Sequence, residues 1–282
     1  MTIDEWLAGS ITNLKQAQIE TARLDCLVLL EDILCQDRAW LLAHPEVVIG
    51  SVKLGTLKKL LRRRATHEPL AYIRGKVEFY GRDFTVDSNV LVPRPETETM
   101  VELLRTLMAE LQVASGTPNN GTYWQIADIG TGCGAIGITA ALELSEASVT
   151  LTDISTAAIE VAKVNVINFA TAVTIQKSDL LRDTTNSYDI LLCNLPYVPD
   201  EYNVNRAATH EPKLALFAGA DGLDLYRRLF AQTVSLQVRP LYILCEALPS
   251  THVELTAIAA SSGYTLTKTD DFIQQFRLTG SK

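Results

Sequence analysis

The C-terminal two thirds of the chain alternates short apolar runs with segments of helical spacing, and this alternation limits the possible folds most. The apolar runs typical of strands lie at residues 124–129, 148–153, 173–179, 188–194 and 241–247. The segments with helical spacing lie at about 134–145, 155–169, 223–236 and 250–262. Strands that alternate with helices predict a mostly parallel sheet covered by helices on both faces.

The chain closes with two strand-like segments, YTLTKTD at 264–270 and FIQQFRLTG at 272–280, with no helical segment between them. We therefore expect a final hairpin that places one antiparallel strand in the sheet. An ordinary dinucleotide-binding fold would more often continue with further strand–helix units.

The part of the chain before the sheet divides into two further regions. Residues 1–75 are rich in Leu, Ala and charged residues at helical spacing, which predicts a small helical bundle. Residues 76–95 alternate apolar and polar residues and predict a β-hairpin linker. From Thr97 a helix is expected, with Thr99 and Glu102 in capping-box spacing, and it should fade in the loop at 114–123. The sheet domain then covers 96–282.

Charge is unevenly divided along the chain. Residues 1–75 carry net charge +1 and the remainder −9, which sum to −8. The basic cluster KLGTLKKLLRRR should form a helix with Leu54, Leu57, Leu60 and Leu61 as its apolar stripe and the basic side chains in solvent. A protein that binds many phosphates usually has a basic face, so this balance argues against a nucleic-acid substrate.

Composition points to a cytosolic protein without a metal. No apolar stretch approaches the length that crosses a bilayer, and the N-terminal residues MTIDEW lack the pattern of a secretory signal. The five cysteines are scattered and never spaced C-x-x-C, and the four histidines show no ligand spacing. We expect reduced thiols, no zinc site and a cytoplasmic location.

A glycine-rich segment, ADIGTGCGAIG, follows the first strand of the sheet. Glycines there allow a sharp turn and a close approach of the backbone to a cofactor. The segment also satisfies G-x-G-x-x-G, so a nicotinamide or flavin enzyme is an alternative. Asp153 ends the second strand, where a carboxylate can bind both ribose hydroxyls, and Asp179 ends the third, where it could bind an adenine amino group. Helix capping by both aspartates and simple packing of the glycines are the structural alternatives.

Asp128 precedes the glycines, and the DIGTG segment shows no evident need to hold a pyrophosphate. Both features favour S-adenosylmethionine over a dinucleotide. The fourth strand ends in NLPY, from Asn194 to Tyr197. An amide, a proline and a phenol in succession form either an ordinary turn or a reactive site.

The chain resembles the HemK/PrmC family of protein-(glutamine-N5) methyltransferases over almost its whole length. The similarity rests on LVPRPETE at 91–98, DIGTGCGAIG at 128–137, NLPYVP at 194–199 and HEPKLALFAGADGLDLYRRL at 210–229. It implies a Rossmann-like α/β domain of the class I S-adenosylmethionine-dependent methyltransferases. It also implies methylation of a glutamine side chain in peptide chain release factors, at the GGQ motif.

By this resemblance, the Asn194 side-chain oxygen and the Leu195 carbonyl would accept the two N–H bonds of the glutamine amide. Pro196 would fix the turn, and Tyr197 would pack on the amide face. The implied cofactor contacts are Asp128, Gly130, Thr131, Gly132, Cys133, Gly134, Asp153, Asp179, Leu180 and Asn194. The N-terminal helices would recognise the release factor, and neither a metal nor a membrane would be involved.

The sequence departs from the family at Leu195, where proline is usual. The carbonyl proposed as an acceptor is retained there, but the turn loses rigidity. NLPY is also similar to a segment of adenine-N6 dimethyltransferases that act on ribosomal RNA, so methylation of RNA or DNA is the alternative function. A cofactor-binding module without catalysis, or a dinucleotide enzyme, is a third. The PRPETE motif and the excess of acidic over basic residues favour a protein substrate over RNA or DNA.

Overall fold

The computed structural model describes residues 1–115, 123–184 and 186–280, and these residues form two compact units. One unit contains Met1–Lys76 together with Val204–His210, and the other contains Val77–Asn203 and Glu211–Lys282. Much of the loop predicted at 114–123 lies outside the described residues. None of the described helices combines the length and the apolar run needed to cross a membrane.

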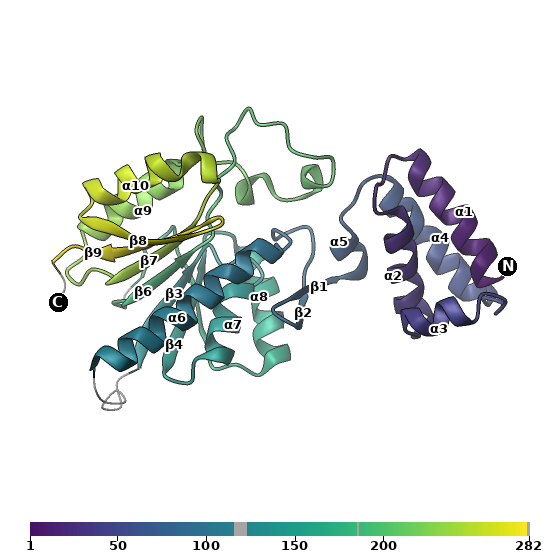
Figure 1. Cartoon of the computed structure of the whole chain (residues 1–282), viewed down its shortest axis with the longest axis horizontal. Coiled ribbons are helices and arrows are strands. Elements are labelled where there is room, and N and C mark those ends of the chain that lie inside the picture. Colours follow the sequence, from purple (N-terminus) through teal and green to yellow (C-terminus); the bar gives the residue numbers. More distant parts are fainter. Residues whose placement is uncertain (116–122, 185, 281–282) are drawn as a thin grey trace. The chain divides into compact units, whose positions relative to one another are not determined.

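The first unit is helical (Figure 1). Its helices are α1 (Ile3–Gln16), α2 (Ala22–Leu34), α3 (Arg38–Ala43), α4 (Ser51–Ala65) and α5 (Leu70–Arg74), followed by the short η2 (Ala208–His210) from the later segment. Helix α1 begins with a capping box between Thr2 and Glu5. A single apolar cluster joins α1, α2 and α4 and includes the Leu54–Leu61 stripe predicted from the sequence.

The basic side chains of α4 are not all solvated, so that part of the prediction was wrong. Arg64 donates to the Asp25 carboxylate at 2.6 Å, and the side chains are only 12% and 4% exposed. Arg63 pairs with Glu68. A largely buried carboxylate needs such a partner, because an unpaired buried charge is costly. Arg64 therefore holds α4 against α2 rather than contributing to a solvent face.

A hairpin of β1 (Lys76–Phe79) and β2 (Arg82–Thr85) follows, and from Val77 onward it belongs to the second unit. The predicted hairpin is confirmed but is shorter than expected, because Val90 and Val92 are buried without joining a strand. A 3-10 turn, η1 (Pro95–Thr97), leads into α6 (Glu98–Ser115). Thr99 thus lies inside the helix and cannot cap it, and Glu102 instead accepts a hydrogen bond from the Tyr80 hydroxyl. The predicted capping box was wrong.

The sheet has seven strands in the order β5-β4-β3-β6-β7-β9-β8. Their bounds are β3 (Trp124–Ile129), β4 (Ala147–Asp153), β5 (Thr174–Lys177), β6 (Ile190–Cys193), β7 (Tyr242–Glu246), β8 (Tyr264–Asp270) and β9 (Ile273–Leu278). All neighbours pair in parallel except β9, which is antiparallel to both β7 and β8. The predicted parallel sheet with one antiparallel strand from a final hairpin is confirmed.

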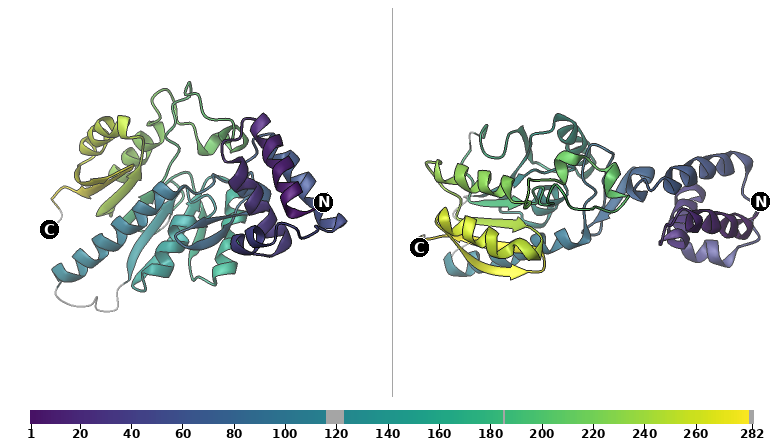
Figure 2. Two further views of the ribbon diagram at one scale, coloured as in Figure 1. Left: turned by 45° about the vertical axis from the view of Figure 1, so that its right-hand side comes forward. Right: turned by 90° about the horizontal axis from the view of Figure 1, so that it is seen from above.

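Helices cover both faces of the sheet (Figures 1 and 2). Helices α6, α7 (Ala135–Glu143) and α8 (Thr156–Phe169) pack together on one face. Helices α9 (Asp224–Val234) and α10 (His252–Ser261) pack together on the other, with the short turns η3 (Lys213–Ala215) and η4 (Pro249–Thr251) nearby in sequence. The buried cluster beneath α9 and α10 takes alternate residues of β3, β6 and β7, as the two-residue repeat of a strand requires. This packing fixes the strand ends at which the site lies.

Candidate active site

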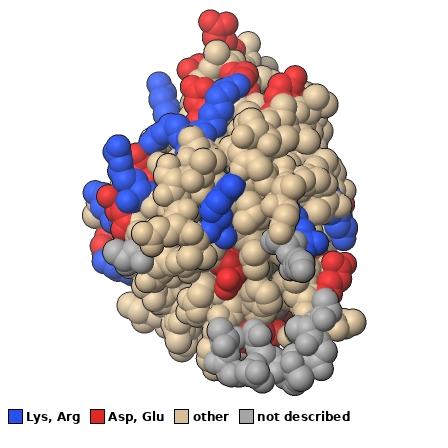
Figure 3. Space-filling model, turned by 90° about the vertical axis from the view of Figure 1, so that its left-hand side faces the viewer, with Lys and Arg blue, Asp and Glu red and all other residues tan. Residues whose placement is uncertain are grey.

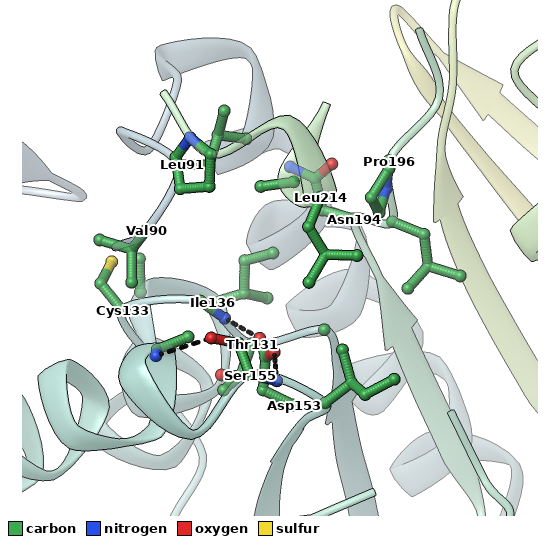
Figure 4. A pocket seen from close by; sticks show the side chains of 18 of the residues that line it. Val90, Leu91, Thr131, Cys133, Ile136, Asp153, Ser155, Asn194, Pro196 and Leu214 are labelled. Carbon is green, nitrogen blue, oxygen red and sulfur yellow. Dashed lines mark hydrogen bonds between the residues drawn. The ribbon is translucent and has the colours of Figure 1, made fainter. Parts of the chain in front are cut away.

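A cavity of about 190 Å³ lies in the second unit at the carboxyl ends of β3, β4, β5 and β6. Each of these strands contributes to its lining where the strand ends, through Gly130, Asp153, Ser178 and Asn194. Figure 4 shows Thr131 and Asp153 on one side of the cavity and Asn194 and Leu214 on the other. In open α/β sheets this edge is the usual place for a ligand.

The glycine loop after β3 forms one wall of the cavity, with Gly130, Thr131, Gly132 and Cys133 in the lining. Gly132 has a φ of +56°, which favours glycine, and a Cβ there would meet nothing within 4 Å. A side chain at this position would therefore project into the space left for a ligand. Gly134 begins α7 and is not part of the lining.

Asp128 is not part of the lining either, so its predicted contact with the cofactor has no direct support in the geometry. The side chain is 1% exposed and lies beneath the loop. Its Oδ2 accepts hydrogen bonds from the Thr131 hydroxyl at 2.5 Å and from the Gly137 N–H at 2.9 Å. Asp128 thus holds the loop against the start of α7.

The Asp128 carboxyl should make folding stability depend on pH. Burial raises its pKa from 3.8 to about 6, although bonds from Thr131 and Gly137 oppose the shift. The folded protein then holds the proton more tightly than the unfolded chain, so stability falls as pH rises from about 4 to about 6. Relative to Asp128→Asn, which does not titrate, wild type should lose up to about 3 kcal/mol of unfolding free energy over this range. Denaturant unfolding of both proteins at about pH 4 and pH 7 measures this, and a pH-independent difference would contradict it.

Asp153, at the end of β4, links the glycine loop to the next helix. Its Oδ2 accepts from the Gly132 N–H at 3.0 Å and its Oδ1 from the Ser155 N–H at 2.8 Å. Burial is the main cause that raises the pKa of this carboxyl, and these amide bonds oppose it. A carboxylate has about four lone-pair sites, so each oxygen can still accept one hydroxyl. Asp153 therefore has the chemistry to bind a ribose.

Asp153→Ala should weaken S-adenosylmethionine binding by roughly ten- to a hundredfold, which is the loss of about 1.5 to 3 kcal/mol from charge-assisted hydrogen bonds. Titration calorimetry measures this affinity. Asp270→Ala, which removes an exposed carboxylate at the end of β8, is the matched control and should bind as wild type does. Equal affinity in Asp153→Ala and the control would leave Asp153 with a structural role only.

Asp179, the predicted adenine contact, and Leu180, a predicted cofactor contact, follow β5 and line the cavity. Asp179 accepts a hydrogen bond from Arg228 of α9 at 2.6 Å, and Arg228 also lines the cavity. The sequence did not reveal this ion pair, because the two residues lie 49 positions apart. Asp179 is therefore neither an isolated acceptor nor a helix cap, and any hydrogen bond to an adenine would be shared with Arg228.

The residues after β6 form a turn that we call the Asn194–Tyr197 turn. Asn194, Leu195 and Pro196 line the cavity. The Asn194 Nδ2 donates to Thr97 Oγ1 at 3.2 Å, which leaves Oδ1 as the end of the amide that can accept from a substrate. Tyr197 is not part of the lining, and its hydroxyl donates to the Glu246 carboxylate at 3.0 Å. The predicted packing of Tyr197 on a substrate amide thus stays a prediction.

Two of the quoted motifs, PRPETE and HEPKLALFAGADGLDLYRRL, meet beside this turn. Arg94 of the first pairs with Glu211 of the second at 2.6 Å, and the Glu211 side chain is 1% exposed. Further along, Val198 forms a parallel bridge with Phe217. The sequence showed that these motifs were distinctive but gave them no role, whereas the structure shows that they support the turn.

Thr97 and Glu246 lie at this site although the sequence did not predict either as a site residue. Thr97 lines the cavity and Glu246 ends β7, in the same way that Asp153 ends β4. A polar residue at the end of an apolar strand could therefore have identified Glu246 as a candidate site residue. Among the described residues, no group of three or more His, Cys, Asp or Glu side chains could hold a metal ion.

Comparison with known proteins identifies both parts of the chain. The family model of the PrmC N-terminal domain matches residues 5–75, and that of the methyltransferase small domain matches residues 105–216. Among solved structures, the human methyltransferase 10 domain containing protein is similar with TM-score 0.50 and 17% identity, covering 84% of this chain and 100% of that one. The hMettl16 catalytic domain has TM-score 0.53 and 14% identity, covering 85% and 84%. At these identities the structures show the fold alone.

Curated relatives extend the match over most of the chain. The release factor glutamine methyltransferase of Koribacter versatilis is 34% identical over 237 residues, covering 82% of this chain and 81% of the relative. That of Coxiella burnetii is 32% identical, covering 87% and 86%. A bifunctional methyltransferase of Rickettsia felis is 32% identical over 94% of this chain, which spans about 55% of that longer relative. The chain therefore belongs to the HemK/PrmC family of release factor glutamine methyltransferases.

Proposed function

We propose that this enzyme transfers a methyl group from S-adenosylmethionine to the side-chain nitrogen of a glutamine in a peptide chain release factor. The observation that carries the proposal is the Asn194–Tyr197 turn at the edge of the cavity. Its Asn194 amide has its nitrogen held by Thr97 and its oxygen left to accept from a substrate. A primary amide has two N–H bonds to donate, and this turn offers acceptors for both.

The cavity fits S-adenosylmethionine at several points. Gly132 leaves room for a ligand where a side chain would fill it, and Asp153 faces the cavity with acceptor positions for a ribose. Leu180 and Ile136 add apolar lining. When bound, S-adenosylmethionine would supply an electrophilic methyl group: a nitrogen nucleophile forms a bond to the methyl carbon as the C–S bond breaks, and S-adenosylhomocysteine is the leaving group.

The task of the protein is to make a poor nucleophile reactive, because the lone pair of an amide nitrogen is delocalised into its carbonyl. In the proposed arrangement, Asn194 Oδ1 and the Leu195 carbonyl accept the two N–H bonds and fix the direction of the nitrogen. These bonds strengthen as positive charge develops on nitrogen, so they favour the transition state over the ground state. Pro196 restrains the turn. Orientation and electrostatics then carry the methyl transfer without a dedicated base. The methylated nitrogen is a strong acid and gives up one proton to water.

We propose a division of labour between the two units, with residues 1–75 recognising the release factor, 76–95 acting as a linker and 96–282 performing the chemistry. All cavity-lining residues belong to the second unit, which supports placing the chemistry outside residues 1–75. The 76–95 segment is more than a linker in this respect, because Phe79, Asn89, Val90, Leu91 and Pro93 line the cavity. On the face drawn in Figure 3, the Lys and Arg side chains of the described residues are interspersed with Asp and Glu. Together with the net charge of −8, this favours a protein substrate over RNA or DNA. We also propose that the enzyme acts in the cytoplasm without binding membranes.

Transfer of label from radioactive S-adenosylmethionine tests the function. Wild type should label a release factor on glutamine and should not label a variant whose GGQ glutamine is replaced by alanine. Label in RNA or DNA instead would support the alternative adenine methyltransferase. Cofactor binding without any transfer would support a module that does not catalyse the reaction.

Removal of residues 1–75 should separate recognition from chemistry. We expect S-adenosylmethionine affinity to stay within about threefold of wild type, because the cavity lies entirely in the other unit. Methylation of an intact release factor should fall far more than methylation of a short glutamine peptide. Because Val204–His210 belongs to the same compact unit as the removed helices, circular dichroism must first show that the truncated protein is folded. Equal losses on both substrates would contradict the proposed division.

A further inference from the structure

A buried carboxylate, Glu246, lies beside the Asn194–Tyr197 turn and has no part in the mechanism above. The parallel register pairs Cys193 with Cys245, so the next residues along the two strands are Asn194 and Glu246. The Tyr226 hydroxyl contacts the carbonyl oxygens of both Cys193 and Glu246 and ties the strand ends together. Glu246 is therefore held at a fixed place next to Asn194.

Glu246 is too well buried to be an incidental surface group. It is 1% exposed, and its Oε1 accepts from the Tyr197 hydroxyl at 3.0 Å. Its Oε2 makes no hydrogen bond of ordinary length and angle among the described residues, although the Thr97 and Asn194 side chains lie close enough to stabilise the charge on this carboxylate. Burial of a carboxylate costs free energy unless it is compensated, so a purely structural role would be better served by an apolar residue. The position needs an acceptor.

The orientation of the Asn194 amide explains why an acceptor is needed. Oxygen and nitrogen of an amide are nearly the same size, so packing alone does not decide which one faces the substrate. The bond from Asn194 Nδ2 to Thr97 Oγ1 does not decide it either, because a hydroxyl can donate as well as accept. If Thr97 donated to Asn194, the amide would present its nitrogen to the cavity and could not accept from a glutamine.

A carboxylate near Thr97 removes this ambiguity, because an ionised carboxylate can only accept hydrogen bonds. Burial raises the pKa of Glu246, while hydrogen bonding from Thr97, Tyr197 and Asn194 opposes the rise, which places all three polar groups around the same carboxylate. A Thr97 hydroxyl that directs its proton towards the nearby Glu246 carboxylate would have only lone pairs left for Asn194. The Asn194 nitrogen must then face Thr97, and its oxygen must face the cavity.

On the basis of the proposed function, we infer that Glu246 is a positioning residue that orients the Asn194 side-chain oxygen towards the substrate amide through Thr97. It also holds the Tyr197 ring by its hydroxyl. Glu246 touches neither substrate nor cofactor in this role. A loss of this orientation should lower kcat most, because the hydrogen bond from the substrate amide to Asn194 Oδ1 is the one that strengthens in the transition state.

Glu246→Gln tests this directly. Glutamine keeps an oxygen that can accept from Tyr197, but its amide nitrogen can donate to Thr97 and reverse the hydrogen bonds to Asn194. We expect kcat for release factor methylation to fall about tenfold or more, while the S-adenosylmethionine affinity stays within about twofold. Glu254→Gln, which makes the same change on the exposed face of α10, is the matched control. A kcat within twofold of this control would overturn the inference.

A double variant distinguishes orientation of Asn194 from general damage. If Glu246 acts through Asn194, Glu246→Gln combined with Asn194→Ala should be no slower than Asn194→Ala alone, because the oriented oxygen is already absent. Losses that multiply would overturn the inference. Failure of the proposed function would look different. Wild type and Glu254→Gln would then bind the cofactor but label no release factor, whereas an active Glu246→Gln variant would overturn only the inference about Glu246.

Thr97→Val keeps the inference testable if Glu246→Gln does not fold. It removes the hydroxyl between Glu246 and Asn194 at nearly constant volume and leaves the carboxylate in place. The same loss in kcat is expected, with the same lack of further loss when combined with Asn194→Ala, and Thr97→Ser should lose several-fold less because it keeps the hydroxyl. Wild-type kcat in a folded Thr97→Val variant would overturn the role of Thr97, and with it the role of Glu246.

Discussion

Asn194→Ala is expected to lower kcat for release factor methylation by roughly 10²- to 10³-fold, comparable to the loss of one oriented donor or acceptor in a transition-state site. The substitution removes the Oδ1 acceptor, and it also removes the hydrogen bond that Asn194 Nδ2 donates to Thr97 Oγ1. The amide nitrogen of the substrate could then rotate away from the methyl group. Single-turnover kinetics with a saturating release factor measures this effect on the chemical step.

Cofactor binding separates this effect from damage to the cavity. Asn194 is one of many lining residues, so the affinity for S-adenosylmethionine should change by no more than about threefold. Asn203→Ala, a change of the same side chain at an exposed position of the same unit, is the control for expression and folding. If Asn194→Ala kept full activity on a glutamine-containing release factor, the NLPY segment would be only a turn after a buried strand.

Strand ends were the most predictable part of this protein. Apolar runs marked the strands, and the parallel alternation required their carboxyl ends to share one edge of the sheet. Asp153 and Asn194 could therefore be assigned to one site before any coordinates, and both line the cavity. The antiparallel β9 was expected from the absence of a helix before the last strand, whereas the order of the strands is known only from the structure.

The contacts between distant segments could not be predicted in the same way. Arg64 was assigned to solvent because helical spacing shows which face is polar, but not that Asp25 lies buried opposite it. Asp128 was assigned to the cofactor because it adjoins the glycines, yet its carboxylate lies beneath the loop and accepts from the Gly137 N–H. In each case the partner is set by tertiary packing, which a local pattern does not encode.

Gly222, the last residue of the FAGADG segment, allows this segment to pack closely against the Asn194–Tyr197 turn. Its φ is +78°, in the region that favours glycine, and its backbone packs directly on the Asn194–Tyr197 turn. A Cβ on Gly222 would overlap the Tyr197 carbonyl oxygen and would lie 3.3 Å from the Pro199 nitrogen. Both are backbone atoms, so relief of the overlap requires the turn itself to move.

Gly222→Ala is therefore expected to lower kcat/KM for release factor methylation by about 10²-fold or more, because a displacement of about 1 Å can cost this much when the reaction depends on orientation. Gly219→Ala is the matched control. Gly219 has a similar φ of +82°, but the atoms nearest to its Cβ would be those of the Asp224 carboxylate, at the end of a side chain that is 59% exposed and can move away. Both variants thus pay the same backbone strain of roughly 1 to 2 kcal/mol, but only one displaces the turn. Equal loss of activity in the two would show that strain alone is responsible, whereas a selective loss in Gly222→Ala would show that the position of the turn controls the reaction.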